Sequence, residues 1–138
     1  MKKILCGIFL ALLIAGNVSA QEKDGVKVDV LAKTSSSWDG KDLPSYPRGV
    51  PEITILRIHI PPKVELPLHE HPVINAGILI KGELTVVTKN NETLHLKAGD
   101  SIVEVVDKWH YGKNEGNEPA EIIVFYAGLQ GIPITVKK

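Results

Sequence analysis

From Glu52 onward the chain consists of short runs rich in β-branched residues, and this feature most narrowly limits how it can fold. Turn sequences such as Pro61-Pro62 and Lys81-Gly82 separate the runs. Short runs bounded by turns at intervals of roughly eight to twelve residues are typical of an all-β sandwich or barrel. Because no segment has the periodicity of a three-turn helix, the sequence predicts an all-β fold.

The predicted strands occupy most of the chain after residue 50, and no internal repeat divides them. We therefore expect residues 50–138 to form one barrel domain. The runs expected to be strands are Glu52–Ile60, Glu65–His71, Val73–Ile80, Glu83–Lys89, Glu92–Lys97, Ser101–Val106, His110–Asn114, Ala120–Tyr126 and Ile134–Lys137.

Residues 1–20 have the three parts of a secretory signal peptide. A basic start precedes an apolar run at residues 4–15, and residues 18–20 form a small-residue cleavage site. The apolar run is too short to cross a hydrocarbon core of about 30 Å as a helix. We therefore expect a periplasmic or secreted protein that begins at Gln21 and carries no membrane anchor after cleavage.

Residues 21–49 are predicted to form an N-terminal strand and an arm. Lys27–Ala32 alternates in the manner of a strand, whereas Lys33–Gly49 is rich in Ser, Gly and Pro, which interrupt regular structure. Trp38 and Tyr46 either fill an apolar groove on their own barrel or serve as a lid or an oligomer contact. The burial of aromatic side chains in small domains favours the groove.

The charge balance argues against several classes of partner. The chain has 16 Lys and Arg residues against 16 Asp and Glu residues, and its basic residues are scattered singly. Nucleic-acid binding normally requires a basic stripe, and binding to a membrane surface requires a basic amphipathic helix. We therefore expect a small-molecule ligand and no nucleic-acid partner.

Three histidines carry the strongest indication of chemistry. His69 and His71 are two residues apart in a predicted strand, so their side chains project from the same side. One His-x-His pair would be weak support, because such histidines often serve only in packing. Together with His110 and Asn75, the pair could hold one transition-metal ion, whose bonds to nitrogen are about 2.0–2.1 Å long.

The spacing of these residues resembles the two sequence motifs of the cupin superfamily. The first motif reads Gly-x5-His-x-His-x3,4-Glu-x6-Gly, and the second reads Gly-x5-Pro-x-Gly-x2-His-x3-Asn. The resemblance implies a small single-domain cupin, which is a double-stranded β-helix or jelly-roll barrel, with a metal held by the motif histidines. The matching positions, between residues 50 and 128, are His69, His71, Gly82, Gly99, His110 and Asn114.

The sequence departs from these motifs at four positions. Lys63, Val105 and Asp107 replace residues of turns, and we expect them to alter turns more than chemistry. Asn75 replaces the glutamate ligand, so that three neutral imidazoles and at most one amide oxygen remain. Such a set favours one divalent transition metal (Zn, Fe, Ni, Cu or Mn) over Mg or Ca, which prefer several hard oxygen ligands. Asn75 is thus either a weak metal ligand or none.

Glu104 is the leading candidate for a catalytic acid or base. It stands in the apolar run Ser101–Val106, six residues before His110. It is either buried beside the metal, as general base, fourth ligand or orienting partner of a histidine, or exposed on a strand.

Strand alternation also assigns the neighbours of the site. His59 and His95 alternate with apolar residues and are expected at the surface, and Trp109 and Tyr111 are expected to cover the rim of the barrel. The aliphatic pocket lining expected from the sequence is Ile58, Ile78, Ile80, Val86 and Phe125.

These features favour a metal-dependent enzyme of isomerase or dioxygenase type. Its substrate would be an oxygen-rich small molecule such as a sugar acid, a keto acid or a phenolic compound. The alternative is a non-catalytic cupin module that binds a metal or a small ligand. A third interpretation is a barrel whose histidines only pack and whose arm supports a homodimer. The resemblance to cupins implies a homodimer formed through the N-terminal strand.

Overall fold

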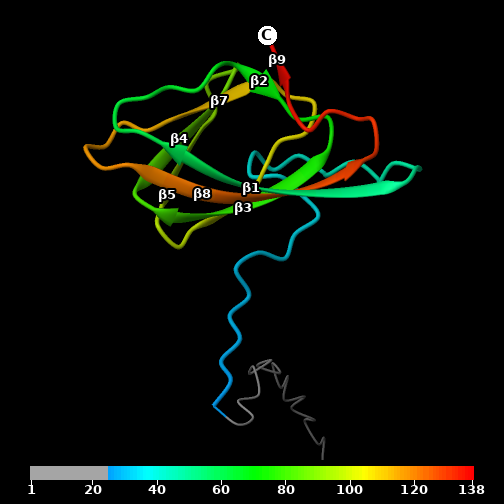
Figure 1. The fold of residues 1–138 in the computed structure, drawn as a ribbon, viewed down its shortest axis with the longest axis horizontal. Coiled ribbons are helices and arrows are strands. Elements are labelled where there is room, and N and C mark those ends of the chain that lie inside the picture. The colour runs from blue at the N-terminus through cyan, green and yellow to red at the C-terminus, as the bar shows by residue number, and fades with distance from the viewer. Residues whose placement is uncertain (1–24) are drawn as a thin grey trace, which may run out of the picture.

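The computed structural model describes residues 25–138, and the signal peptide predicted at residues 1–20 lies outside them. Among the described residues the regular secondary structure consists of strands alone, so the all-β prediction is confirmed. The same residues contain no helix long and apolar enough to span a bilayer. The strands form two antiparallel sheets that enclose the core (Figure 1).

One sheet has four strands in the order β1-β8-β3-β6. Its two longest strands, β1 and β8, pair from Pro51↔Leu129 to Ile60↔Ala120 without a break in register. β3 pairs with β8 on one side and with β6 on the other. The strand bounds are Pro51–Ile60 for β1, Ile74–Lys81 for β3, Ser101–Val103 for β6 and Ala120–Leu129 for β8.

The second sheet has five strands in the order β5-β4-β7-β2-β9. Here β4 pairs with both β5 and β7, and the short β2 lies between β7 and β9. The strand bounds are His69–Glu70 for β2, Glu83–Thr88 for β4, Thr93–Lys97 for β5, His110–Lys113 for β7 and Val136–Lys137 for β9.

Two strands are much shorter than the sequence predicts. The run Glu65–His71 contributes only the two residues of β2, because Pro67 and Pro72 flank it and a proline has no N–H for the ladder. The run Ser101–Val106 contributes only the three residues of β6, and the chain then turns at Asp107. Both strands therefore end early, and the chain that follows each of them is irregular.

The strand predicted at Lys27–Ala32 is wrong. This segment is extended and exposed, and it joins neither sheet. Its apolar residues alternate as in a strand, but alternation gives a strand only where a neighbouring strand supplies hydrogen-bond partners. The other predicted strands agree with the structure to within about three residues at each end, which is the usual precision of such boundaries.

Strand alternation sorts the residues of the four-stranded sheet into two faces. On β8, Ile122, Val124 and Tyr126 are buried between the sheets, whereas Phe125 is 46% exposed. The inward face builds the core together with residues such as Leu79, which is fully buried. The outward face, which we call the outer face, carries the exposed side chains of Ile53, Ile55 and Phe125.

The arm folds back on itself at residues 35–43, which we call the arm hairpin. An isolated bridge joins Ser36 to Asp42, and Trp38 packs against the core of the barrel. The groove interpretation is therefore right for Trp38. It is wrong for Tyr46, whose side chain is 77% exposed.

Two departures from the cupin motifs keep a backbone conformation that glycine adopts easily. Lys63 has φ of 63° and Asp107 has φ of 52°, both in the left-handed region that costs a side chain energy. Gly82 has φ of 73°, and a Cβ there would lie 2.6 Å from the carbonyl oxygen of Pro119. The turns of the motifs are therefore kept even where their glycines are not.

Candidate metal centre

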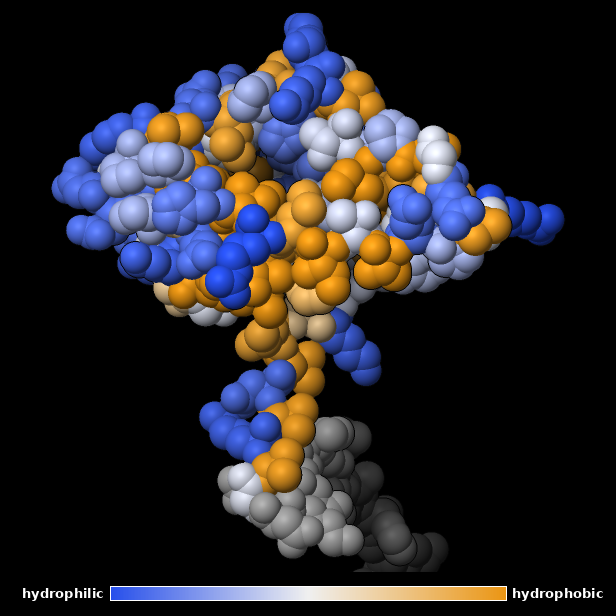
Figure 2. All heavy atoms as spheres, in the orientation of Figure 1, coloured by the Kyte–Doolittle hydropathy of each residue, from blue (hydrophilic) through white to orange (hydrophobic). Residues whose placement is uncertain are grey.

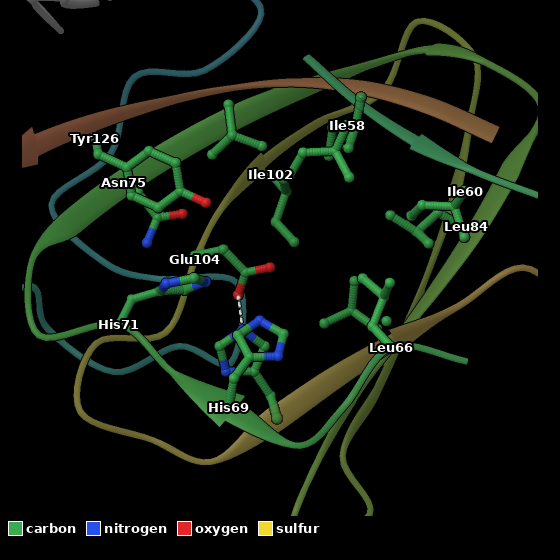
Figure 3. A pocket seen from close by; sticks show the side chains of 15 residues that line it. Ile58, Ile60, Leu66, His69, His71, Asn75, Leu84, Ile102, Glu104 and Tyr126 are labelled. Atoms are coloured by element: carbon green, nitrogen blue, oxygen red, sulfur yellow. Dashed lines mark ion pairs between the residues drawn. The ribbon is translucent and has the colours of Figure 1, made fainter. Parts of the chain in front are cut away.

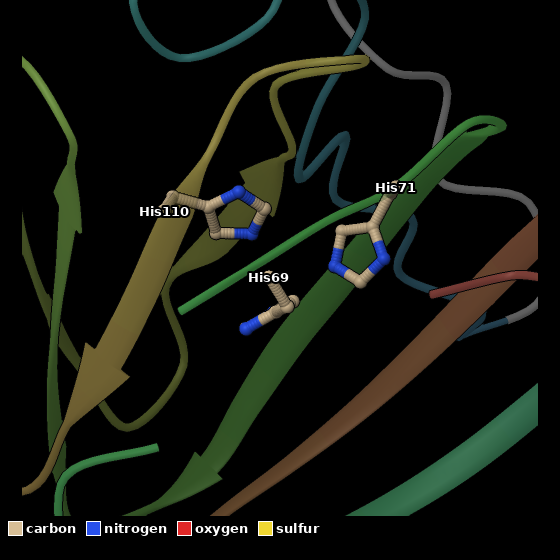
Figure 4. A group of neighbouring side chains, drawn as sticks. All are labelled: His69, His71 and His110. Atoms are coloured by element: carbon tan, nitrogen blue, oxygen red, sulfur yellow. The ribbon is translucent and has the colours of Figure 1, made fainter. Parts of the chain in front are cut away.

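The three motif histidines meet at one point inside the barrel (Figure 4). His69 in β2 lies opposite His110 in β7, and His71 directly follows β2. One ligand nitrogen from each lies within 4.8 Å of those of the other two, and the ring centroids are 4.5–5.0 Å apart. The structure thus brings together the three histidines that the sequence predicts, close enough for one cation.

Hydrogen bonds to the backbone orient all three imidazoles. The Nδ1 atom of His69 lies 2.7 Å from the carbonyl oxygen of Pro67, and that of His71 lies 2.7 Å from the carbonyl oxygen of Ile134. The Nδ1 atom of His110 lies 2.8 Å from the carbonyl oxygen of Lys108. A carbonyl oxygen only accepts, so each Nδ1 donates its hydrogen. Each Nε2 is then left with the lone pair that a metal requires.

Burial keeps these imidazoles neutral. Loss of hydration lowers the pKa of His69 and of His110, and it lowers the pKa of His71 to about 4. Neighbouring imidazoles lower the pKa values of His69 and His71 further, since two cations would repel each other. A metal ion binds only the neutral form, so protons compete with it less than they would at exposed histidines.

Asn75 in β3 is 1% exposed and lines the same pocket as the histidines. Its Oδ1 is buried and has no hydrogen-bond partner among the described residues. Its Nδ2 donates to the carbonyl oxygen of Val73 over a long 3.4 Å. A buried acceptor without a partner costs about 1–3 kcal/mol, which a bound cation would offset. The residues present therefore fit a metal ion, while ligation by Asn75 itself stays a prediction.

Glu104 is 9% exposed and lies beside the histidines, so its placement at an exposed strand position is excluded. Its Oε2 accepts hydrogen bonds from Val105 N (3.1 Å) and Trp38 Nε1 (3.4 Å). The same oxygen lies 3.6 Å from His110 Nε2, which is too long for a hydrogen bond. Burial raises the pKa of Glu104 to about 7, against the opposing effect of its two donors.

The histidines, Asn75 and Glu104 face a small and mostly apolar cavity of about 60 Å³ (Figure 3). Of the lining predicted from the sequence, Ile58 and Val86 are confirmed. The sequence missed part of the lining, which is contributed by β1, β4, β6, alternate residues of β8 and the loop before β2. These missed apolar residues are Ile60, Leu66, Leu84, Ile102, Ile122 and Val124.

Three residues that the sequence predicts in the lining do not line the cavity. The alternation of side chains along a strand explains why. Ile78, Ile80 and Phe125 lie outside this cavity, and Ile80 and Phe125 are 40% and 46% exposed. Asn75 points inward, so residues separated from it by an odd number along β3 point outward. The sequence contained this signal, because Asn75 and Ile78 cannot face the same side of one strand.

Tyr126 is a further residue of the site that the sequence did not suggest. Its ring lies 5.3 Å from that of His71, between ring centroids, and it lines the cavity. Burial raises the pKa of its hydroxyl to about 12, so the group stays protonated. Tyr126 is thus a neutral side chain beside the histidines.

The other residues singled out in the sequence lie away from the histidines. His59 and His95 are exposed, as predicted, and Trp109 and Tyr111 are partly buried. Asn114, the last motif position, instead connects separate segments of the chain by hydrogen bonds. Its Nδ2 donates to the carbonyl oxygens of Ile60, Pro61 and Glu118.

Fold and site together define a small β-barrel whose three clustered histidines could hold a metal ion. A family model described as a cupin domain matches residues 56–126, which is more than half of the 138-residue chain. The chain therefore belongs to the cupin family, as the motif spacing predicts. No curated protein matches the chain.

Solved structures with this fold include an uncharacterized conserved protein with a double-stranded β-helix domain from Klebsiella pneumoniae. It is 25% identical, with a TM-score of 0.55, and the match covers 67% of this chain and 90% of that one. An oxalate oxidase in complex with the substrate analogue glycolate is also 25% identical, with a TM-score of 0.53. That match covers 62% of this chain and 45% of the oxidase, so this chain spans less than half of the oxidase.

An oxalate decarboxylase from Bacillus subtilis, a protein with Mn(II) centres, has the same fold. It is 23% identical, with a TM-score of 0.53, and the match covers 62% of this chain and 23% of the decarboxylase. At this identity the likeness supports the fold alone.

Proposed function

We propose that this chain is a metal-dependent cupin enzyme that acts on a small oxygen-rich acid. One observation carries the proposal: three imidazoles with their Nε2 atoms free converge beside the buried carboxylate of Glu104. A set of neutral nitrogens suits Zn, Fe, Ni, Cu or Mn. When bound, such an ion supplies a positive charge that polarises a carbonyl or carboxylate oxygen.

The side chains of the site would have separate roles. His69, His71 and His110 hold the ion, and Asn75 offers it an amide oxygen. Glu104 would hold or move a proton, because burial raises its pKa to about 7 in the metal-free site, and a bound cation would favour its ionised form. The aliphatic lining excludes water, which strengthens every electrostatic interaction in the cavity.

The size of the cavity narrows the substrate class. A cavity of about 60 Å³ is small beside the pockets of about 300–1,000 Å³ that hold drug-sized ligands. A short hydroxy or keto acid suits this space better than a sugar acid or a phenolic ring. The glycolate bound to the related oxalate oxidase is a molecule of this size and supports the narrower class. Isomerase and dioxygenase chemistry both remain within the proposal.

The test begins with elemental analysis of protein purified without chelator, which should contain about one transition-metal ion per chain. Short hydroxy and keto acids are then assayed with and without dioxygen, which separates the two reaction types. Glu104→Gln should abolish turnover at saturating metal, whereas the exposed Glu83→Gln should not. A metal-free protein whose histidines bind no added ion would contradict the proposal.

A non-catalytic binding module is the alternative, and Asn75 is the observation in its favour. The cupin motif has a glutamate at this position, and a neutral amide leaves the metal with less charge compensation. Full metal content together with no turnover of any assayed acid would support the module. Turnover that is lost in Glu104→Gln would support the enzyme.

We propose a periplasmic or secreted location from the leader predicted at residues 1–20. Sequencing of the mature N-terminus from a native host should begin at Gln21. An uncleaved Met1 would contradict this prediction.

We also propose that two copies of the chain pair through their outer faces and arms. Ile53 and Ile55 on β1 are 65% and 58% exposed, and Val28 and Val30 on the arm are 65% and 75% exposed. Figure 2 shows apolar side chains gathered over the middle of the barrel and along the extended arm. Two apolar surfaces of this kind on one chain favour contact with a second copy, since water contact with both is costly.

A further inference from the structure

The arm hairpin is attached to the barrel directly beside the candidate metal centre. Within the hairpin, Ser37 N donates to the carbonyl oxygen of Lys41 and Leu43 N donates to that of Ser35, both at 2.8 Å. At its tip, Trp38 N donates to the carbonyl oxygen of Val103, the last residue of β6, at 2.9 Å. The tip is therefore tied to the strand that leads into Glu104.

The first contact from this tip reaches the carboxylate. The indole Nε1 of Trp38 donates to Glu104 Oε2 over 3.4 Å, and the ring packs against the core. The same Oε2 lies 3.6 Å from His110 Nε2. Glu104 thus stands between an arm residue and a predicted metal ligand.

The second residue at the tip, Asp39, is linked to His110 through Lys108. Asp39, whose side chain is 1% exposed, pairs with Lys108 at 2.7 Å. Asp39 Oδ1 also accepts from Ser37 Oγ (2.7 Å) and Lys41 N (3.1 Å), which holds the carboxylate within the hairpin. The carbonyl oxygen of Lys108 accepts from His110 Nδ1 at 2.8 Å. One residue of the hairpin therefore contacts Glu104 directly, and its neighbour is linked to His110 through Lys108.

We propose that Trp38 is a positioning residue whose indole N–H holds the Glu104 carboxylate toward the metal centre. The pairing of Asp39 with Lys108 keeps the hairpin tip in place for this contact. The inference rests on the proposed function in assuming that the histidines bind a cation. A carboxylate held toward the cation attracts it, whereas a carboxylate free to rotate spends part of its time farther away.

The first test is a double-mutant cycle on the affinity of the full chain for Zn²⁺, measured by calorimetry on metal-free protein. Glu104→Gln should weaken Zn²⁺ binding about tenfold, and Trp38→Phe, which keeps a ring but removes the N–H, about three- to fivefold. The double variant should bind no more weakly than Glu104→Gln alone, because Trp38 acts through the carboxylate.

Controls separate positioning from a general effect on stability. Tyr46→Phe changes an exposed aromatic of the same arm and should leave the affinity unchanged. Unfolding temperatures of all variants show whether they remain folded under the conditions of the titration. Losses that multiply in the double variant would overturn the proposal, because they would mean that Trp38 supports the site without Glu104.

The second test needs no metal and no tryptophan variant. The chain has two tryptophans, so a ¹⁵N–¹H spectrum contains two indole signals. Glu104→Gln should move the Trp38 signal and leave that of Trp109 in place, because only Trp38 donates to this carboxylate. An unmoved Trp38 signal would overturn the inference. Absence of Zn²⁺ binding by the unmodified protein, with a shifted Trp38 signal, would instead contradict the proposed function.

Discussion

The candidate metal centre and the outer face of the four-stranded sheet are opposite in character. At the centre, polar groups are buried and almost all have a partner, such as the carbonyl oxygens 2.7–2.8 Å from each imidazole Nδ1. On the outer face, the apolar side chains of Ile53, Ile55 and Phe125 are 46–65% exposed. Each region therefore holds side chains in an environment that hydration disfavours: polar groups in the interior and apolar groups in water.

Strand alternation produces this contrast, because neighbours on one strand serve different regions. Tyr126 is 3% exposed beside the histidines, while Phe125 before it is 46% exposed on the outer face. Buried polar groups and exposed apolar groups both cost free energy unless a partner is supplied. The difference teaches that different partners would stabilise the two regions: the proposed cation inside the barrel and the proposed second copy of the chain on the outer face.

The strongest way to break the comparison is to remove a ligand from the inside. His71→Ala should weaken Zn²⁺ binding by more than about 100-fold, because residues that merely orient a ligand already contribute about 10–100-fold. Calorimetry on metal-free protein measures this loss. His95→Ala, at an exposed histidine of β5, is the matched control and should bind as the unmodified chain does. Equal affinities in the two variants would place the metal elsewhere.

A second prediction concerns the cost of the buried carboxylate. The pKa of Glu104 is raised from 4.5 to about 7, so the folded protein holds its proton over a range in which the unfolded chain has lost it. Stability from this group is therefore present below pH 4.5 and is lost as pH rises toward 7. Glu104→Gln cannot ionise, so at pH 8 the free energy of unfolding of the metal-free variant should exceed that of the unmodified chain by about 3 kcal/mol.

Denaturant unfolding at pH 5 and pH 8 checks the prediction for Glu104. The two proteins should differ least at pH 5, and Glu83→Gln, at an exposed carboxylate, should show little change at either pH. A variant that is less stable than the unmodified chain at pH 8 would mean that the carboxylate stabilises the fold. In that case the buried carboxylate would not lower the stability of the fold, as functional groups in active sites commonly do.

The third prediction tests the outside of the comparison. Phe125→Glu places a charge at the centre of the outer face, opposite Ile55 on β1. It should weaken the proposed dimer by about 2 kcal/mol, roughly 30-fold, while leaving Zn²⁺ affinity unchanged. Light scattering coupled to size exclusion measures the change, with Thr93→Glu on the other sheet as control. If the unmodified chain is a monomer in solution, the proposed dimer through this face is wrong.

The fourth prediction concerns Asn75 Oδ1, the buried side-chain oxygen that has no hydrogen-bond partner among the described residues. Asn75→Glu restores the carboxylate of the cupin motif and should tighten Zn²⁺ binding about tenfold, since it adds a negative charge to a cationic site. Asn75→Gln, which lengthens the side chain without a charge, should not tighten it. Unchanged affinity in Asn75→Glu would place this side chain outside the set of ligands.

The smallest expected effect concerns a turn that leads to the histidines. Lys63 has φ of 63°, a conformation that glycine adopts at less cost. Lys63→Gly should raise the free energy of unfolding by about 0.5–1 kcal/mol, after the greater freedom of glycine in the unfolded chain is subtracted. Lys63→Ala also loses the hydrogen bond from Nζ to the carbonyl oxygen of Glu115 but keeps the strain. It should therefore be less stable than the glycine variant.

The sequence by itself determined the fold class and the three histidines. Alternation requires His69 and His71 to project from one side of a strand, and fixed motif spacing adds His110. These are local rules, so they can be applied without knowledge of which segments pack together. The same rule correctly placed His59 and His95 at the surface, and it failed for Ile78 because the parity set by Asn75 was not applied along β3.

Only the tertiary structure decided how the site is held. His71 Nδ1 pairs with the carbonyl oxygen of Ile134, 63 residues away, and Trp38 reaches Glu104 across 66 residues. The strand predicted at Lys27–Ala32 failed for a related reason, since a strand needs a partner that alternation cannot supply. Long-range hydrogen bonds, burial and partner strands depend on the packing of distant segments, and no local pattern in the chain records that packing.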